Sequence, residues 1–104
     1  MFEFIESPLF ERWVYEYLDD ESYSALQAAL SRWPEAGDLI PGSGGCRKLR
    51  WHTPGKCKRG GIRVIYYLKL RDGCIWLLTI YGKNMQENIP GHVLKALKET
   101  IVHD

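Results

Sequence analysis

The feature that most restricts the fold of this chain is a pair of apolar, strand-like segments joined by a short turn. Residues 62–70 (IRVIYYLKL) are dense in β-branched and aromatic side chains, which is the composition of a β-strand. Arg71, Asp72 and Gly73 follow and predict a tight hairpin of the D-G type. The return segment, residues 74–82 (CIWLLTIYG), is apolar nearly throughout. We therefore expect a central strand that is covered on both faces.

The N-terminal third of the chain predicts a short strand and two helices. Residues 2–6 (FEFIE) alternate with the period of a strand, and Ser7 followed by Pro8 fits a helix N-cap and first helical position. Asp19 and Asp20 can end this helix and cap a second one, which Pro34 stops. The expected buried stripes are Phe10, Trp13, Val14, Tyr17 and Leu18 in the first helix, and Tyr23, Leu26, Leu30 and Trp33 in the second.

The remaining segments complete a single α+β domain over residues 1–104. Residues 35–46 and 52–61 are rich in glycine and proline and predict loops on either side of a strand at residues 46–52. Asn88 and Pro90 open a terminal helix, whose apolar stripe is Val93, Leu94, Leu97 and Ile101. The predicted order is β-α-α-β-β-β-α, with a small antiparallel sheet packed by helices.

Several classes of protein are excluded by the composition. With 45% hydrophobic and 26% charged residues the chain is an ordinary globular domain. No apolar run approaches the roughly 18 residues of a membrane span, and the acidic N-terminus does not resemble a signal peptide, so we expect a cytoplasmic protein. Disulfide or metal-ligand spacing is absent, so we expect reduced thiols and neither a metal nor another cofactor; the residues concerned are Cys46, Cys57, Cys74, His52, His92 and His103.

The charges are strongly segregated along the chain, although the formal net charge is only +1. Residues 1–39 hold nine acids against two arginines, a balance of −7. Residues 40–83 hold ten bases against one acid, a balance of +9, and residues 84–104 hold two lysines against three acids. Such asymmetry within one small domain predicts a face that binds an anion.

Antiparallel pairing of the last three strands brings many of these bases to one edge of the sheet. The fourth predicted strand ends beside the beginning of the third, so Lys83 should lie near Arg63, and the central loop joins them there. Crowded cations repel one another unless an anion is bound. The candidates are Arg47, Lys48 and Arg50 on the second strand, Lys56, Lys58 and Arg59 in the loop, Arg63 on the third strand and Lys83.

Each candidate also has an ordinary structural interpretation. A single lysine is more often solvated surface than a ligand, and Lys69 and Arg71 fit hairpin surface. Arg63 is the strongest candidate, because a charge next to an apolar strand usually has a partner. Strand aromatics are more often core than base-stacking platforms, and His52 is either a proton-transfer group or a half-buried structural histidine. The aromatic side chains in question are Tyr66, Tyr67, Trp76 and Tyr81.

A site rich in bases and poor in acids suits RNA cleavage without a metal. In that reaction the 2′-hydroxyl attacks the adjacent phosphate, whose additional negative charge must be stabilised. Arginine matches phosphate oxygens with a fixed fork of donors. A lysine crowded by other cations has a lowered pKa and can transfer a proton.

Two long stretches of the chain resemble the RelE/HigB toxins of bacterial type II toxin–antitoxin modules. Residues 39–69 read LIPGSGGCRKLRWHTPGKCKRGGIRVIYYLK, and residues 75–89 read IWLLTIYGKNMQENI. The resemblance is closest to the HigB-like branch, with its PG-x-GG-x-RK-x-R and GK-x-KRGG-x-R-x-IYY patterns. The acidic PEAGD before them and the closing YGKN belong to the same pattern, and the predicted element order matches over nearly the whole chain.

The resemblance implies a microbial-RNase-like α+β fold that enters the ribosomal A site and cleaves messenger RNA there. It also implies a cognate antitoxin, expected to be a helix-turn-helix protein, that neutralises the toxin. Lys48, Arg50, Arg63 and Lys83 match the family's catalytic positions, and Arg63 is the first choice for phosphate stabilisation. Arg47, Lys56, Lys58 and Arg59 are then expected to bind RNA or the ribosome.

The resemblance has one departure and leaves two alternatives open. Many RelE-type sequences place an arginine and then a tyrosine after the last strand, where this chain has Gln86 and Pro90. The central-loop residues Lys56, Lys58 and Arg59 are then candidates to replace part of the function of the missing arginine and tyrosine. The alternatives to a ribonuclease are a ParE-like toxin that acts on DNA gyrase and an RNA-binding module that does not cut.

Overall fold

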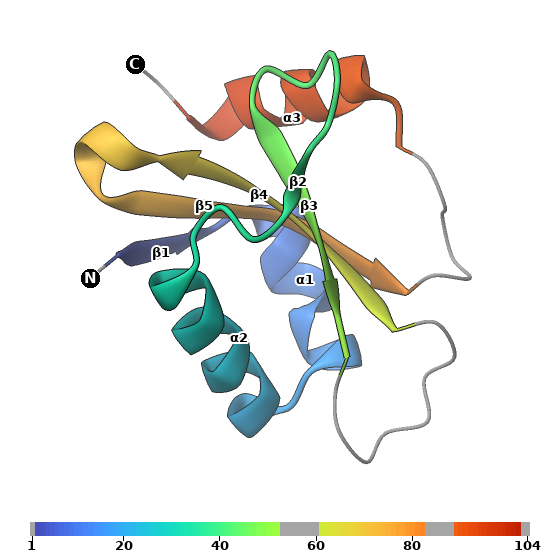
Figure 1. The fold of residues 1–104 in the computed structure, drawn as a ribbon. Helices are drawn as coiled ribbons and strands as arrows, with labels where there is room; N and C mark the ends of the chain where they lie inside the picture. The colour runs from blue at the N-terminus through green and yellow to red at the C-terminus, as the bar shows by residue number, and fades with distance from the viewer. Residues whose placement is uncertain (1, 53–60, 83–88, 103–104) are drawn as a thin grey trace.

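The computed structural model describes residues 2–52, 61–82 and 89–102, which form three α-helices and one five-stranded sheet (Figure 1). The strands lie in the order β1-β5-β4-β3-β2, with β1 parallel to β5 and the other neighbours antiparallel. The predicted α+β class is confirmed, with one strand more than expected. The elements are β1 (Glu3–Glu6), α1 (Pro8–Tyr17), α2 (Asp20–Arg32), β2 (Asp38–Leu39), β3 (Cys46–Trp51), β4 (Ile62–Lys69), β5 (Cys74–Gly82) and α3 (Gly91–Ile101).

Both N-terminal helices begin where the sequence predicts. The hydroxyl of Ser7 accepts a hydrogen bond from the Phe10 amide at 3.0 Å and donates one to the Leu78 carbonyl at 2.6 Å. This buried serine therefore caps α1 and also ties the helix to β5. Asp19 caps α2 by accepting a hydrogen bond from the Ser22 amide at 2.8 Å.

The sheet is packed on both faces, as expected from its apolar central strand. In Figure 1, α1 and α2 lie on one side of the sheet and α3 lies on the other. The core on the first side joins Phe10 and Leu26 to Tyr66 and Ile75, and the core on the second side joins Cys46 and Ile65 to Leu94. β5 has β1 and β4 as neighbours and contributes buried residues to both cores. No helix in the described residues is long and apolar enough to cross a bilayer.

Two tryptophans that were predicted to be buried lie at the surface. Trp33 is 58% exposed because it is the C-cap of α2, where the backbone has already left helical geometry and turned out of the apolar stripe. Trp13 is 38% exposed at the rim of the stripe that buries Phe10 and Val14. An arginine lies over each exposed ring, with Arg12 5.3 Å from the Trp13 centroid and Arg32 5.0 Å from the Trp33 centroid.

The segment from residue 35 to residue 46, predicted as a loop, contains the short strand β2. Asp38 pairs with Lys48 and Leu39 pairs with Arg47, so the chain folds back along β3. The turn between them uses Gly42, where φ is +73°, a conformation that favours glycine. A strand of two residues is too short to show an alternating pattern, which is why the sequence predicts only a loop.

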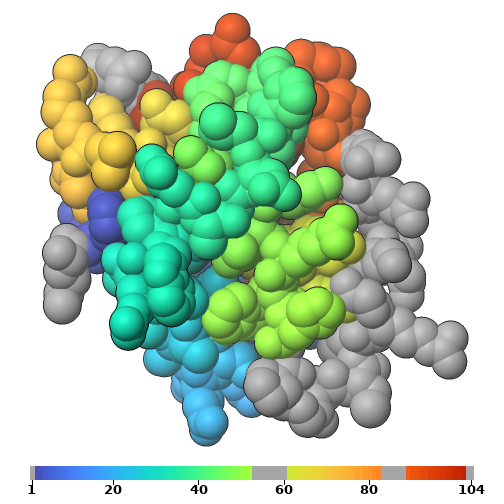
Figure 2. All heavy atoms as spheres, in the orientation of Figure 1, coloured from blue at the N-terminus to red at the C-terminus, as the bar shows by residue number. Residues whose placement is uncertain are grey.

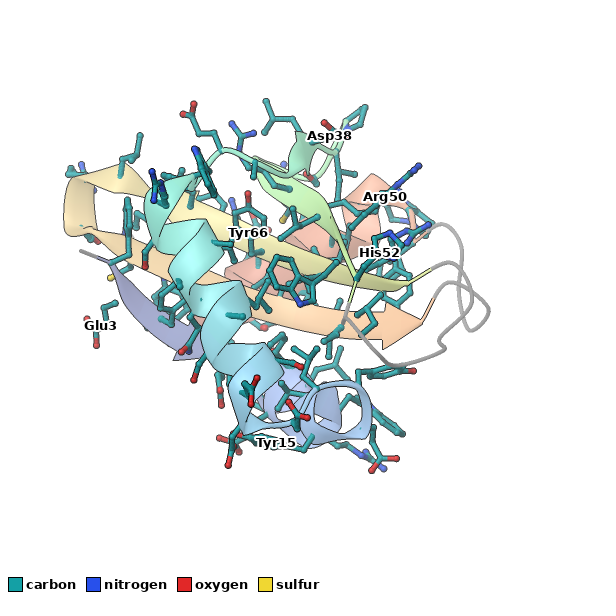
Figure 3. The ribbon with its side chains drawn as sticks, turned by 60° about the horizontal axis from the view of Figure 1, so that its bottom comes forward. Glu3, Tyr15, Asp38, Arg50, His52 and Tyr66 are labelled. Atoms are coloured by element: carbon teal, nitrogen blue, oxygen red, sulfur yellow. The ribbon has the colours of Figure 1, made fainter. Side chains whose placement is uncertain are left out.

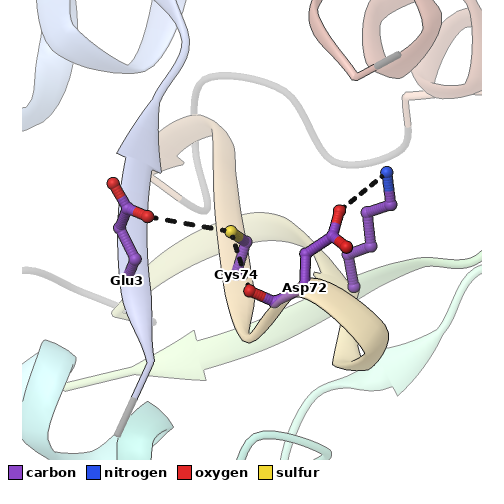
Figure 4. Close-up of polar contacts among 4 residues, drawn as sticks. Glu3, Asp72 and Cys74 are labelled. Atoms are coloured by element: carbon purple, nitrogen blue, oxygen red, sulfur yellow. Dashed lines mark hydrogen bonds and ion pairs between the residues drawn. The ribbon is translucent and has the colours of Figure 1, made fainter. Parts of the chain in front are cut away.

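The hairpin between β4 and β5 is wider than the predicted tight turn. Lys69 pairs with Cys74, and the four residues between them form a 3-10 turn that ends on Gly73 in the left-handed region (φ +65°). Figure 4 shows the polar contacts of this hairpin end, where Lys69 forms an ion pair of 3.0 Å with Asp72. The Cys74 thiol lies 3.5 Å from the Asp72 carbonyl and 4.0 Å from a Glu3 carboxylate oxygen. The Lys69 side chain is only 11% exposed, so it is an ion-paired, largely covered part of the hairpin end, whereas the sequence suggests free surface.

Candidate nucleic-acid interface

Three of the four predicted catalytic bases lie on the same face of the sheet. Arg50 is directly opposite Arg63 in the β3–β4 ladder, and Lys48 is opposite Ile65. Side chains alternate along a strand, so Lys48 and Arg50 point to the same face as Cys46. Their cross-strand partners on β4, Ile65 and Arg63, point to that face as well. Cys46 and Ile65 belong to the core that contains Leu94 of α3, so the three bases point to the α3 side of the sheet.

Among the described residues, the polar contacts of α3 fall at one end of that face. Its Leu94 carbonyl lies 3.9 Å from the Cys46 thiol, and its Lys98 ammonium donates to the Gly44 carbonyl at 3.1 Å and lies 4.6 Å from the Tyr67 ring centroid. These contacts are at the beginning of β3 and the end of β4. Arg50 and Arg63 lie toward the opposite end of the two strands, where Arg50 is exposed and Arg63 is half-buried.

A cavity of about 550 Å³ opens between α3 and the β2–β3 edge on this face. Lys48 and Arg50 bring positive charge to its wall, and the remaining wall is largely apolar. Figure 2 shows the side chains of β3 at the surface of the molecule, next to the segment that contains β2. The described residues that line the cavity are Ala36, Asp38, Leu39, Ile40, Pro41, Lys48, Leu49, Arg50, Ile65, Tyr81, Ile89 and Leu94.

Asp38 is a site residue that sequence reasoning missed. It is directly opposite Lys48 in the β2–β3 ladder, and it lines the same cavity. Figure 3 shows Asp38 and Arg50 along the same edge of the sheet. Asp38 lies in the acidic PEAGD stretch, but its place in the basic site depends on β2, whose pairing no local pattern reveals.

Arg47 has a different position from the other predicted bases. Strand alternation turns it to the opposite face from Lys48, and its guanidinium donates to the Gly37 carbonyl at 2.7 Å and to the Glu35 carbonyl at 3.3 Å. The buried Tyr66 hydroxyl accepts from the Gly37 amide at 2.9 Å and donates to the Pro34 carbonyl at 2.7 Å. Arg47 and Tyr66 thus hold the segment that carries Asp38 in place.

The four other predicted bases lie outside the described residues; they are Lys56, Lys58, Arg59 and Lys83. The strand ends next to them are described. Ile62 at the start of β4 pairs with Gly82 at the end of β5, so the expected proximity of these two strand ends is confirmed. Gln86, the position of the family departure, also lies outside the described part of the chain.

The strand aromatics belong mainly to the core. Tyr66 is fully buried and Tyr81 is 7% exposed, so neither offers a free ring face for stacking. Burial raises the pKa of the Tyr81 phenol, and the positive charge of Arg63 acts in the opposite direction. Tyr81 is opposite Arg63 in the β4–β5 ladder and lines the cavity, so its neutral hydroxyl is a hydrogen-bond group within the site.

His52 is exposed, which differs from the half-buried structural position considered above. It follows β3 directly, and its ring lies against Gly61, where a Cβ atom would come within 2.8 Å of the His52 Cε1 atom. Figure 3 shows His52 close to Arg50 at the same end of the sheet. Within the described residues, His, Cys, Asp and Glu side chains do not gather in threes around a possible metal position.

No model of a known protein family matches this chain. Among solved structures, the E. coli toxin RelE, determined in the free state as a variant with two arginines replaced by alanine, matches with a TM-score of 0.59. The match covers 97% of this chain and 98% of that chain at 15% sequence identity. The chain has the fold of RelE. This match confirms the α+β architecture that the sequence resemblance implies.

Proposed function

We propose that this chain is the toxin of a type II toxin–antitoxin module and that it cleaves messenger RNA in the ribosomal A site. The observation that carries the proposal is that Lys48, Arg50 and Arg63 lie on one face of the sheet, on adjoining positions of β3 and β4. Two arginines held directly opposite each other repel in the absence of an anion. A polyanion that binds between them removes that repulsion, and RNA supplies closely spaced phosphates.

The reaction that suits this site is attack of an RNA 2′-hydroxyl on its own 3′-phosphate. The new bond joins the 2′-oxygen to phosphorus, and the bond to the 5′-oxygen of the next nucleotide breaks. The products are a 2′,3′-cyclic phosphate and a free 5′-hydroxyl, so one proton leaves the attacking oxygen and one reaches the leaving oxygen. Arg50 and Arg63 would stabilise the additional negative charge on the phosphate oxygens.

The basic face favours a ribonuclease over a gyrase-directed toxin of the ParE type. A toxin that acts on a protein surface has no need to concentrate cations at one end of a sheet. An RNA-binding module without cleavage shares the same electrostatics, and only the products of the reaction distinguish it from a ribonuclease.

The proposed partners are the ribosome with its messenger RNA and a cognate antitoxin. The HigB-like sequence patterns favour an antitoxin of the helix-turn-helix type. A small helix-turn-helix protein encoded beside this chain, and co-purifying with it, is the expected observation. The site of action is then the cytoplasm.

Expression in bacteria tests the proposal. The wild-type chain should arrest growth and produce new messenger RNA ends at codon-spaced positions, detected by primer extension on total RNA. Arg63→Ala should remove both effects, whereas Arg71→Ala, at the exposed hairpin end, should retain them. Growth arrest without new ends would support a ParE-like toxin instead, and absence of arrest would contradict the toxin assignment.

A further inference from the structure

We propose that Asp38 selects the nucleotide at the cleavage site by accepting a hydrogen bond from an exocyclic amino group of its base. This inference rests on the proposed ribonuclease function and deepens it, because it names the class of base that the cavity prefers. Adenine, cytosine and guanine carry such an amino group, and uracil carries carbonyl oxygens instead.

The position of Asp38 relative to the cations is the first argument. Asp38 and Lys48 are cross-strand partners, and both line the cavity together with Arg50. A nucleotide whose phosphate is bound by Lys48 and Arg50 therefore has a carboxylate within the same cavity as its base. A carboxylate accepts hydrogen bonds and donates none, so it binds an amino group of a base and repels a carbonyl oxygen.

The shape and lining of the cavity are the second argument. The volume of about 550 Å³ exceeds what a phosphate alone would fill. The apolar side chains of the lining include Ile40, Ile65 and Leu94. A cavity that combines apolar side chains with a carboxylate and two cations is the arrangement expected for a base and its phosphate.

The rigidity of the segment before Asp38 is the third argument. Gly37 is fixed by Tyr66 at its amide and by Arg47 at its carbonyl, with distances of 2.9 Å and 2.7 Å. A Cβ atom at Gly37 would come within 2.8 Å of the Tyr66 ring, so the backbone is closely packed at this point. A group that discriminates between bases has to be held in place by its surroundings, and these contacts supply that support.

The experiment compares messenger RNAs that differ by one amino group. Ribosomes are programmed with end-labelled messenger RNA in which one adenosine near the cleavage site is replaced by purine riboside, which lacks only the 6-amino group. Single-turnover cleavage rates are measured at each replaced position. The wild-type chain should cut the modified RNA about ten- to a hundredfold more slowly at one position, the discrimination of a good base contact.

Asp38→Ala should bring the ratio of the two rates close to one. Glu35→Ala is the matched control, because it removes a carboxylate from the same segment outside the cavity, and it should keep the wild-type ratio. Circular dichroism and urea unfolding establish that both variants are folded.

The outcomes separate the inference from the proposed function. Cleavage of both RNAs at equal rates at every position by the wild-type chain would overturn the inference and leave the ribonuclease standing. Discrimination that persists in Asp38→Ala would also overturn it, as would a folded Asp38→Ala that cuts neither RNA, because Asp38 would then act in the chemistry itself. A wild-type chain that cuts no RNA on ribosomes would contradict both proposals.

Discussion

Arg50 lies directly opposite Arg63 in the antiparallel ladder between β3 and β4. Like charges in this relationship destabilise a sheet, whereas most cross-strand pairs stabilise it. The two arginines therefore bring two positive charges to the point where we propose that the phosphate binds. Stability and function should respond in opposite directions when this pair is changed.

Neutralising Arg50 should make the protein more stable and less active. Arg50→Gln removes the repulsion across the ladder, and we expect the free energy of unfolding to rise by about 0.2–1 kcal/mol at low salt. The gain should shrink as salt screens the charges. Urea unfolding at low and high salt measures it, and a variant less stable than wild type would contradict the interpretation of the pair.

Removing the Tyr66 hydroxyl should destabilise the fold. Tyr66→Phe leaves the Gly37 amide and the Pro34 carbonyl without their buried partner, and we expect a loss of about 1–3 kcal/mol in the free energy of unfolding. Tyr15→Phe is the control. Tyr15 is 61% exposed, so removing its hydroxyl should lower the free energy of unfolding much less. Equal unfolding midpoints for the two variants would show that the hydroxyl of Tyr66 does not hold this segment.

Buried tyrosines should make the protein unstable at alkaline pH. Burial raises the pKa values of Tyr66 and Tyr81 above their ordinary value of 10.0. Above that pH the unfolded chain releases phenolic protons that the folded chain retains, so the contribution of these two phenols to the free energy of unfolding is constant below it and falls as the pH rises further. Urea unfolding as a function of pH measures the fall, and Tyr81→Phe should reduce it. A stability that rises through this range would contradict the burial argument.

Binding to messenger-RNA-programmed ribosomes should depend strongly on salt. If the basic site neutralises about four phosphates of a single strand, the slope of log K against log salt should be near −3. Lys48→Ala should make the slope shallower by about one unit. Arg71→Ala, which removes a charge from the far hairpin, should leave it unchanged. Filter binding over a salt series gives the slopes, and a nearly flat wild-type slope would exclude this face as the contact surface.

The features that local chemistry determines were predictable from the sequence. Ser7 and Asp19 cap their helices because a short polar side chain at this position can accept a hydrogen bond from an unpaired backbone amide of the first helical turn. The β4–β5 hairpin and its central strand follow from two apolar runs around a glycine. Arg63 was placed correctly on the third predicted strand, which is β4, and beside the end of the fourth predicted strand, which is β5.

The features that depend on register were not predictable. Arg47 and Lys48 are adjacent and both basic, yet they have different roles. Arg47 holds the segment around Gly37 on one face of the sheet, and Lys48 lines the cavity on the opposite face. Side chains alternate along β3, so the residue that faces the site is the one whose side chain points to the α3 side of the sheet. The sequence does not show which of the two alternating sets points to that side. Asp38 enters the site through pairing of a two-residue strand, and Trp33 leaves the core because the helix ends one residue earlier.

The most direct test of the central claim is cleavage of end-labelled messenger RNA on purified, programmed ribosomes by the wild-type chain, Arg63→Ala and Arg71→Ala. We expect cleavage by the wild type and by Arg71→Ala, with 2′,3′-cyclic phosphate ends on the upstream fragment. We expect a single-turnover rate about a hundred- to a thousandfold lower for Arg63→Ala, the effect of removing one group that stabilises transition-state charge. Cleavage by a folded Arg63→Ala at the wild-type rate would contradict the proposed role of this arginine in RNA cleavage.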